Sequence, residues 1–346
     1  MLCAFYSVPT SGFSGLRVSF AVAIASAACY YAPTLSEIND RCPNLALGVL
    51  IAILVKDYIL PTMLTWSYVG PPMNTRRKVM ISTWEEPGRS GEIYAELDLD
   101  MTEALKYIDE MKKSGKRVTI THMVLKAIGN ALRAVPSVNG RIVFGRFIPF
   151  EKVDLSCLVR LEEGRDLAMA RISDADKKDV FQIADVLVQQ ANRLHEGKDE
   201  DYNKSKSSMS LLSTGILRKV IHTVGWLAGG LGLTIPALGV KRFVFGGAMV
   251  SSIGSMGLDT CYIPFTPWAR VPLVVCVGTV TDRAVVEADP KTGAKAVVIR
   301  PILALTATID HRFMDGSQGA QLAKEIRATF ANPAVKMNGC DSWAPA

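Results

Sequence analysis

The chain has 346 residues, of which 49% are hydrophobic and 21% charged, and its formal net charge is +6 at pH 7. This composition excludes global disorder, and the length suffices for one domain of about 250 residues with an extra segment, or for two average domains. Because the modest positive charge comes without a long Lys/Arg run and without interleaved aromatic residues, we expect no nucleic-acid partner.

Residues 1–70 differ in character from the rest because they contain two apolar runs, Val18–Ala32 and Asn44–Val55. The first run has the length of the apolar core of a signal peptide. The chain has no acidic residue before Glu37, a feature that would also fit a mitochondrial transit peptide. The second run continues past Lys56-Asp57 and is marginal as a membrane span. A removed targeting segment, a membrane anchor and a hydrophobic packing arm all fit this segment. We expect membrane association, with a mitochondrial location after removal of the segment as the alternative.

A second domain is predicted over residues 71–346, after the break Gly70-Pro71-Pro72. Alternating apolar and polar residues predict its strands, and apolar residues at helical spacing predict its helices. The strands are expected at Glu92–Leu99, Val153–Arg160, Ala248–Val250, Leu273–Val280 and Val297–Ile309, and the helices at Met101–Lys113, Val118–Ala134, Val180–Leu194 and Gln318–Phe330.

Three local features refine this assignment. Asp100 and Glu103 have the spacing of a capping box for the first helix. His122 opens the second helix, where a histidine is more often a cap or a satisfied surface group than a catalyst. Lys198–Ser208 is polar and highly charged, which predicts an exposed loop.

Val220–Val240 contains no charged residue and is preceded by Arg218-Lys219 and followed by Lys241-Arg242. Its hydropathy is that of a membrane span, but five glycines and Pro236 would break a spanning helix. Two interpretations remain open. The segment is either an interfacial or lid segment flanked by cations, or a buried glycine-rich loop of the core.

Phe245–Gly257 is the first stretch that carries possible chemistry. A short strand runs into Ser251-Ser252 and then into a glycine turn. Hydroxyl groups at the end of a strand can donate hydrogen bonds to an oxyanion, although Ser-Ser before glycine is by itself ordinary turn chemistry.

Leu303–Ser317 is the second such stretch. An alternating strand ends at Ile309, and Asp310, His311, Arg312, Asp315 and Gly316 follow within seven positions before a helix. A histidine held between a strand and a helix can present one ring nitrogen to a substrate while the other is tied back locally. Asp315 could orient this loop through a charged hydrogen bond.

Together the two stretches resemble the signature of the 2-oxoacid dehydrogenase acyltransferases, whose catalytic domains share a fold with chloramphenicol acetyltransferase. Asp-His-Arg-x-x-Asp-Gly matches at 310–316, and Ser251-Ser252 stands where the family has Ser-Asn. The resemblance extends over residues 75–333 and includes Pro-x-x-Asn at 136–139. It implies an α/β fold, an α+β two-layer sandwich in which helices cover a mixed sheet, with the hydrophobic N-terminal segment added.

The same resemblance implies acyl transfer between coenzyme A and a thiol or hydroxyl acceptor. By this resemblance His311 is the general base, Ser251 the oxyanion donor and Asp315 the support of the loop. The supporting residues are Asp310, Arg312, Gly316 and Ser252. Acyl-coenzyme A is then a substrate, and family members are homotrimers with the active site between subunits.

The chain departs from the family pattern in three ways. We find no lipoyl domain, because no Asp-Lys-Ala/Val lies at the tip of an alternating hairpin, and Asp176-Lys177 is more typical of a helix cap. Neither an Ala/Pro linker nor a subunit-binding helix pair is present, so a stand-alone form without its own lipoyl group is expected. The second channel strand, Asp166–Arg171, lacks the usual proline, which leaves room for an acyl acceptor of a different kind. The seven scattered cysteines predict free thiols and no metal site.

A non-enzyme is the alternative interpretation: an inactive membrane or scaffold subunit that keeps the acyltransferase fold. The missing lipoyl machinery, the altered strand and the extra hydrophobic segments favour it. A scaffold, however, has no physical need to keep a histidine, an aspartate and a serine in matching places. A third possibility, acyl transfer at a membrane surface, would account for the segments 18–66 and 220–240.

Overall fold

The computed structural model describes residues 91–161, 166–210, 214–265, 267–288 and 292–338, together with a few residues between 47 and 59. The chain divides into two units, Met1–Pro71 and Pro72–Ala346, and the description that follows concerns the second. The predictions of a targeting segment or anchor in residues 1–70 therefore fall almost entirely outside the described residues.

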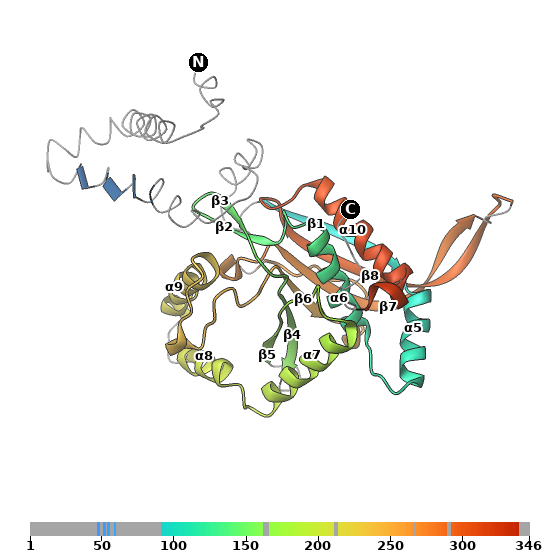
Figure 1. Cartoon of the computed structure of the whole chain (residues 1–346), viewed down its shortest axis with the longest axis horizontal. Coiled ribbons are helices and arrows are strands. Elements are labelled where there is room, and N and C mark those ends of the chain that lie inside the picture. The colour runs from blue at the N-terminus through green and yellow to red at the C-terminus, as the bar shows by residue number, and fades with distance from the viewer. Residues whose placement is uncertain are drawn as a thin grey trace, which may run out of the picture. The chain divides into compact units, whose positions relative to one another are not determined.

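A six-stranded mixed sheet forms the centre of this unit (Figure 1). Its strand order is β1 (Glu92–Asp100), β8 (Lys295–Asp310), β7 (Leu273–Ala288), β6 (Ala248–Ser252), β4 (Leu155–Leu161) and β5 (Asp166–Ile172). β6 is parallel to both β4 and β7, and the remaining neighbours are antiparallel. β2 (Gly140–Val143) and β3 (Arg146–Pro149) pair separately as a short hairpin.

Helices cover one face of the sheet. They are α5 (Thr102–Lys113), α6 (Ile120–Ala134), α7 (Val180–His195) and α10 (Gly316–Ala331), which is followed by the short α11 (Pro333–Lys336). Apolar side chains of these helices and of alternate strand positions, such as Leu125, Val275 and Leu303, form one core cluster. The predicted two-layer α/β fold is confirmed, and each predicted strand and helix is present. Their bounds agree within a few residues except at β7, which runs to Ala288 and not to Val280.

Side-chain caps fix the starts of α6 and α7. Thr119 and His122 form a capping box at α6, and Asp179 and Gln182 form another at α7. The capping box predicted for α5 is wrong, because the N-cap is Met101 and has no side-chain cap. The Asp100 carboxylate accepts instead from the amide and hydroxyl of Thr102, the first residue of the helix.

The exposed loop predicted at Lys198–Ser208 is also wrong. This stretch begins the helix α8 (Glu200–Ser210). Asp199 accepts a hydrogen bond from the Tyr202 amide at 2.9 Å, which is the geometry of an N-cap. The helix contacts a distant turn through the Ser205 hydroxyl, which donates to the Leu238 carbonyl at 3.0 Å. Local sequence contains no sign of this tertiary contact.

Val220–Val240 forms neither a spanning helix nor a single core loop. It completes α9 (Thr214–Gly225), continues as a π-helix at Trp226–Gly230 and ends in a 3-10 turn at Pro236–Leu238. Among the described residues, no helix is both long and apolar enough to cross a membrane. Ala228 is buried while Leu233 is exposed, so the segment lies partly in and partly on the domain.

The three described cysteines, Cys157, Cys261 and Cys276, are free thiols. Burial raises the pKa of both Cys157 and Cys276 to about 12. In the described part of the chain, no group of His, Cys, Asp and Glu side chains has the arrangement of a metal site.

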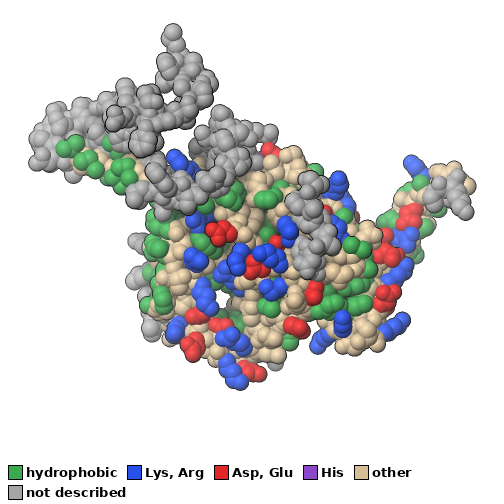
Figure 2. All heavy atoms as spheres, in the orientation of Figure 1, with side chains coloured by type: hydrophobic (Ala, Val, Ile, Leu, Met, Phe, Trp, Pro, Cys, Tyr) green, Lys and Arg blue, Asp and Glu red, His purple; other side chains and the backbone are tan. Residues whose placement is uncertain are grey.

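β7 and β8 extend beyond the other strands as a two-stranded arm, which projects from the body of the domain in Figure 1. Val286 pairs with Val297 on this arm, and both side chains are exposed, as is Ile299. In Figure 2 apolar and charged side chains alternate along the arm. Exposed apolar side chains in such numbers mark a surface that another molecule commonly covers.

His122 makes stability depend on pH. Its side chain is 6% exposed, and burial, followed by the charge of Arg117, lowers its pKa from 6.5 to about 4. The unfolded chain therefore binds a proton at His122 more readily than the folded chain does. The contribution of neutral His122 to the free energy of unfolding is complete above about pH 6.5 and is lost as the pH falls towards 4. This shift in pKa corresponds to a contribution of at most about 3 kcal/mol to the free energy of unfolding.

We predict that the His122→Gln variant loses this pH dependence, because Gln keeps the capping acceptor and cannot titrate. The free energy of unfolding, measured with denaturant at pH 7 and pH 4.5, should fall less in the variant than in the wild type. An identical fall in both proteins would show that other groups cause the acid sensitivity.

Candidate active site

His311 lies directly after the last residue of β8, at the edge of the sheet. Its amide donates to the Gly91 carbonyl at 2.8 Å, and the preceding amide of Asp310 donates to the Pro272 carbonyl at 3.0 Å. The starts of β1 and β7 therefore hold the turn on both sides. The imidazole is half-buried, so the ring is positioned by the sheet and still reaches the surface.

One imidazole nitrogen is engaged by the loop itself. His311 Nδ1 lies 2.6 Å from the carbonyl oxygen of Met314. Because a carbonyl oxygen can only accept, Nδ1 must carry the proton, and the lone pair of the neutral ring is then on Nε2. The predicted local tie of one ring nitrogen is confirmed, and the other nitrogen has the tautomer that a general base requires.

Asp310 and Arg312 form a buried ion pair on either side of His311. The Arg312 side chain contacts the carboxylate through Nε at 3.0 Å and Nη2 at 2.8 Å, and the Arg312 amide also donates to it at 3.0 Å. The Asp310 side chain is only 3% exposed. Such a bidentate pair fixes the turn geometrically, and removing one partner would leave the other charge buried and unpaired.

Asp315 caps α10, the helix that follows the turn. Its carboxylate accepts from the Ser317 amide at 3.2 Å and from the Ser317 hydroxyl at 3.1 Å, while its own amide donates to the Gln318 side chain. Asp315 thus joins the His311 turn to the helix, as expected of a loop support. A Cβ at Gly316 would meet nothing within 4 Å, so space within this chain does not explain the glycine.

Ser251 and Ser252 lie at the end of β6, away from His311. Ser251 pairs with Cys276, and Cys276 pairs with Thr306 on β8. His311 follows Thr306 by five positions, and at ~3.4 Å per residue the two sites are about 17 Å apart along the strand. The structure therefore does not bring the predicted base and the predicted oxyanion donor together within one chain.

Ser251 lies on the face of the sheet that the helices leave open. Its alternate neighbour Met249 packs with Phe265 and Val274 in a separate cluster, whereas Val250 belongs to the helix-covered core. The Thr306 hydroxyl on this face donates to the Cys261 carbonyl. Because residues paired directly across neighbouring strands lie on one face, Ser251 faces the same side as Cys276 and Thr306.

An aromatic contact near His311 was not predicted. Phe313, two residues after His311, packs edge to face against Phe147 of the β2–β3 hairpin, with ring centroids 6.0 Å apart. The hairpin therefore forms a wall beside the His311 turn. The sequence alone does not reveal the hairpin, because two four-residue strands joined by Phe144-Gly145 give too short a pattern to recognise.

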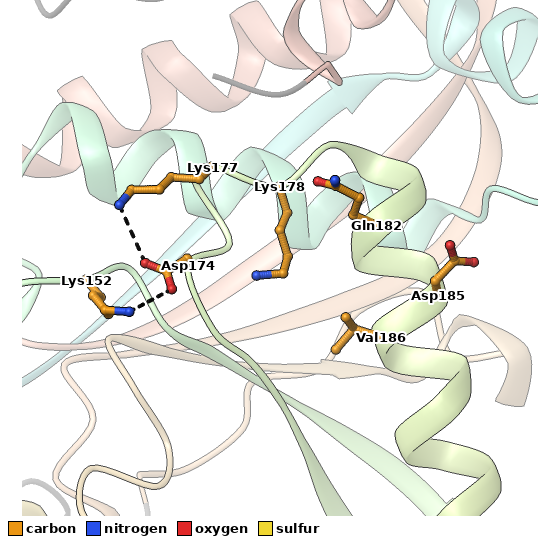
Figure 3. A pocket seen from close by; sticks show the side chains of 7 residues that line it. All are labelled: Lys152, Asp174, Lys177, Lys178, Gln182, Asp185 and Val186. Atoms are coloured by element: carbon orange, nitrogen blue, oxygen red, sulfur yellow. Dashed lines mark hydrogen bonds and ion pairs between the residues drawn. The ribbon is translucent and has the colours of Figure 1, made fainter. Parts of the chain in front are cut away.

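A shallow basin of about 600 Å³ lies beside the start of α7 (Figure 3). Its lining includes three lysines, of which Lys152 and Lys177 both pair with Asp174. Lys178 donates to the Ser173 carbonyl at 2.5 Å. The lysines are thus occupied within the domain. Asp176, predicted as a helix cap, instead pairs with Arg133, and the cap of α7 is Asp179.

The comparisons with known proteins agree on one family. The profile described as "2-oxoacid dehydrogenases acyltransferase (catalytic domain)" matches residues 68–219 and 241–337. The chain is 25% identical over 221 residues to a dihydrolipoyllysine-residue acetyltransferase component of the mitochondrial pyruvate dehydrogenase complex of Arabidopsis thaliana, covering 63% of this chain and 32% of that protein. It is 23% identical to the corresponding component of the acetoin cleaving system of Bacillus subtilis, covering 76% and 56%. The chain thus spans about a third to a half of the length of these relatives.

Solved structures share the fold. A probable dihydrolipoamide acetyltransferase from Listeria monocytogenes superposes with a TM-score of 0.52 at 20% identity, covering 81% of this chain and all of that one. The dihydrolipoamide acetyltransferase of Azotobacter vinelandii superposes with a TM-score of 0.51 at 16% identity, covering 79% of this chain and 96% of that one. The role of a serine, a histidine and an asparagine in the catalytic mechanism of that enzyme has been investigated. The cubic core of a pyruvate dehydrogenase multienzyme complex also gives 0.51, at 17% identity and with the same coverage.

Proposed function

The chain belongs to the family of 2-oxoacid dehydrogenase acyltransferase catalytic domains, and from this premise we propose that it transfers an acyl group between coenzyme A and a thiol acceptor. The observation that carries the proposal is the hydrogen bond from His311 Nδ1 to the Met314 carbonyl, at 2.6 Å. This contact selects the tautomer whose Nε2 can take a proton from the attacking thiol.

His311 would act first as base and then as acid. As the acceptor sulfur attacks the thioester carbonyl, its proton moves to Nε2 and a tetrahedral oxyanion forms. When that intermediate collapses, the bond to the coenzyme A sulfur breaks and the proton on Nε2 neutralises the departing thiolate. The Asp310–Arg312 pair and the Asp315 cap keep the ring in place during both transfers.

The oxyanion donor would come from a second copy of the chain. Ser251 lies about 17 Å along the sheet from His311 of the same chain, which is too far for both to contact one carbonyl group. A homotrimer with the active site between subunits resolves this separation. The exposed apolar side chains of the β7–β8 arm and the multi-subunit core described for a structural relative both support such an assembly.

A dihydrolipoyl group is the first acceptor to test, because the relatives are named as dihydrolipoyllysine-residue acetyltransferases. Membrane association and a mitochondrial location remain predictions, and recovery of the protein with membranes after a carbonate wash would test the first of them.

The proposal is tested by release of free coenzyme A from a panel of acyl donors, short to long, with and without dihydrolipoamide. We expect acceptor-dependent turnover for at least one donor, and the preferred chain length would identify the substrate class. A folded oligomer without turnover on any donor would instead support the non-catalytic scaffold interpretation.

A further inference from the structure

Two thiol groups meet on the sheet face that carries Ser251. Cys276 of β7 lies directly between Ser251 of β6 and Thr306 of β8 in the strand register. The helices leave this face open, yet Cys276 and Thr306 are only 2% and 1% exposed. The hydroxyl of Thr306 donates to the carbonyl of Cys261. Residues 257–263, which we call the covering loop, therefore lie over this part of the sheet and place Cys261 beside Cys276.

The covering loop is attached to the sheet on both sides of Cys261. Before it, the Leu258 carbonyl accepts from the amide and the hydroxyl of Thr279 on β7, each at 3.1 Å. After it, the Tyr262 hydroxyl donates to the Glu96 carboxylate on β1 at 3.1 Å. Cys261 is thus held close to β7, and its neighbours leave it only a small range of movement.

The side chains of the two cysteines are in contact. Both are free thiols, and the Cys261 thiol lies within hydrogen-bonding reach of the Cys276 thiol. Burial, and next the neighbouring Cys261, raise the pKa of Cys276 to about 12. A disulfide bond brings two sulfur atoms to about 2 Å and requires Cα atoms within about 7 Å. Because these thiols are already neighbours, a small shift of the covering loop is enough to reach this geometry.

Cys157 provides the contrast within the same sheet. It lies on β4, is 3% exposed and belongs to the helix-covered core. Its thiol donates to the Leu158 carbonyl at 3.8 Å, and burial raises its pKa to about 12 without a contribution from another thiol. A buried thiol is therefore not by itself a site in this sheet. The covering loop, which supplies a second thiol, distinguishes Cys276 from Cys157.

We propose that Cys261 and Cys276 form a reversible disulfide bond, with a small-molecule disulfide as the oxidant, and that this bond is a redox switch next to Ser251. The bond itself does not depend on the proposed function, whereas its effect on turnover rests on that function. Oxidation would join the covering loop covalently to β7, and reduction would return the pair of free thiols that the structure shows.

Cys261 attacks first, because it is the more exposed of the two thiols. Its thiolate forms a bond to one sulfur of the oxidant, whose own disulfide bond breaks and releases one thiol. The Cys276 thiol then gives up its proton and attacks the Cys261 sulfur of the mixed disulfide, which releases the second thiol. The chain loses two hydrogen atoms, and the oxidant is reduced to two thiols. The second step limits the rate, because the buried Cys276 is rarely a thiolate at pH 7.

The bond would change the surroundings of Ser251. β7 is fixed between β6 and β8, so the covering loop and the Cys276 side chain must move to bring the two sulfurs together. Ser251 is the direct cross-strand neighbour of Cys276, and the Cβ atoms of such pairs are about 5 Å apart. Misplacing a group in an active site by about 1 Å can reduce the rate up to about 10²-fold. We expect the oxidised protein to have a kcat about tenfold lower.

The first experiment detects the bond by peptide mapping of the full chain. The protein is incubated with excess oxidised glutathione, the remaining thiols are alkylated, and trypsin is added. Cleavage after Arg242, Arg270 and Arg283 separates the two cysteines into the peptides 243–270 and 271–283. We expect a species with the summed mass of both peptides less two hydrogen atoms, which dithiothreitol converts back to the separate peptides. Absence of this species from the folded, oxidised protein would overturn the proposal.

Three variants test the order of attack. Cys276→Ala should retain glutathione on Cys261, because no second thiol can displace it. Cys261→Ala should take up little glutathione at Cys276, which is buried. Cys157→Ala is the matched control, a buried thiol without a cysteine partner, and should form the linked species as the wild type does. Equally rapid labelling of Cys276 in Cys261→Ala would contradict the proposed order.

The second experiment follows turnover of acyl-coenzyme A with dihydrolipoamide, starting from oxidised protein. The initial rate should be about tenfold lower than that of reduced protein and should recover during the assay, because the dithiol acceptor reduces the bond. Cys261→Ala should show neither the loss nor the lag. Equal initial rates for the oxidised and reduced wild type would overturn the switch, as would an equal loss in Cys261→Ala. If no donor is turned over, the linked peptide still establishes the bond, and only the proposed function fails.

Discussion

Replacing His311 with alanine should reduce acyl-transfer kcat by about 10²- to 10⁴-fold, the usual contribution of a general base. The imidazole is the group that the β8 turn orients, through the Met314 carbonyl and the amide contact to Gly91. Removing it leaves the Arg312–Asp310 contacts and the hydrogen bonds of Asp315 with Ser317 and Gln318 in place, because these bonds do not involve the ring. The fold should therefore persist, and steady-state turnover with acyl-coenzyme A and dihydrolipoamide measures the loss.

His195→Ala is the matched control for this experiment. His195 is exposed in the last turn of α7, so its removal should change neither turnover nor stability measurably. Circular dichroism and size-exclusion chromatography of both variants confirm that fold and assembly are unchanged. Wild-type turnover in His311→Ala would exclude this residue as the base and would favour the non-catalytic scaffold interpretation.

Mixed oligomers should recover activity that neither parent possesses. Ser251→Ala is expected to reduce kcat because the oxyanion loses a hydrogen-bond donor worth about 3 kcal/mol. If each active site takes His311 from one chain and Ser251 from another, unfolding and refolding His311→Ala with Ser251→Ala in equal amounts creates some sites with both groups. Random assembly gives about one site in four in this state, so about a quarter of wild-type activity should return.

The control for this mixing experiment is a double variant, His311→Ala with Ser251→Ala, refolded with wild type in equal amounts. Here too about one site in four keeps both groups if two chains share the site, whereas one half would remain active if each chain carried a complete site. Absence of recovery between the two single variants, in oligomers shown to be mixed, would place both groups in one chain. That result would contradict the separation along β8.

Much of the fold could be predicted because its signals are local. Glu92–Asp100 forms a strand in which Leu99 is buried and Asp98 and Asp100 are exposed, so its alternation is visible in the sequence. The His311 turn was predictable for a different reason. Its contacts to Met314 and its Asp310–Arg312 pair connect residues only two or three positions apart.

The parts that sequence missed depend on contacts between distant residues. The sequence of α8 is typical of a polar loop. The hydrogen bond from Ser205 to Leu238 and the Lys241–Asp201 ion pair connect this helix to a segment more than thirty positions later in the chain. The Arg141 side chain lies over the ring of Phe243, about a hundred positions later, and nothing near either residue indicates the other. The distance between Ser251 and His311 likewise follows from strand register, which motif spacing does not contain.

The raised pKa of Cys276 has a consequence for the kind of intermediate that the chain can form. Cys276 is the cross-strand neighbour of Ser251, so a thiol lies next to the position proposed for the thioester carbonyl. With a pKa of about 12, only about one Cys276 in 10⁵ is a thiolate at pH 7, and its side chain is 2% exposed. Cys276 is therefore not a competing nucleophile for the acyl group. Transfer would pass from donor sulfur to acceptor sulfur without an acyl group on Cys276.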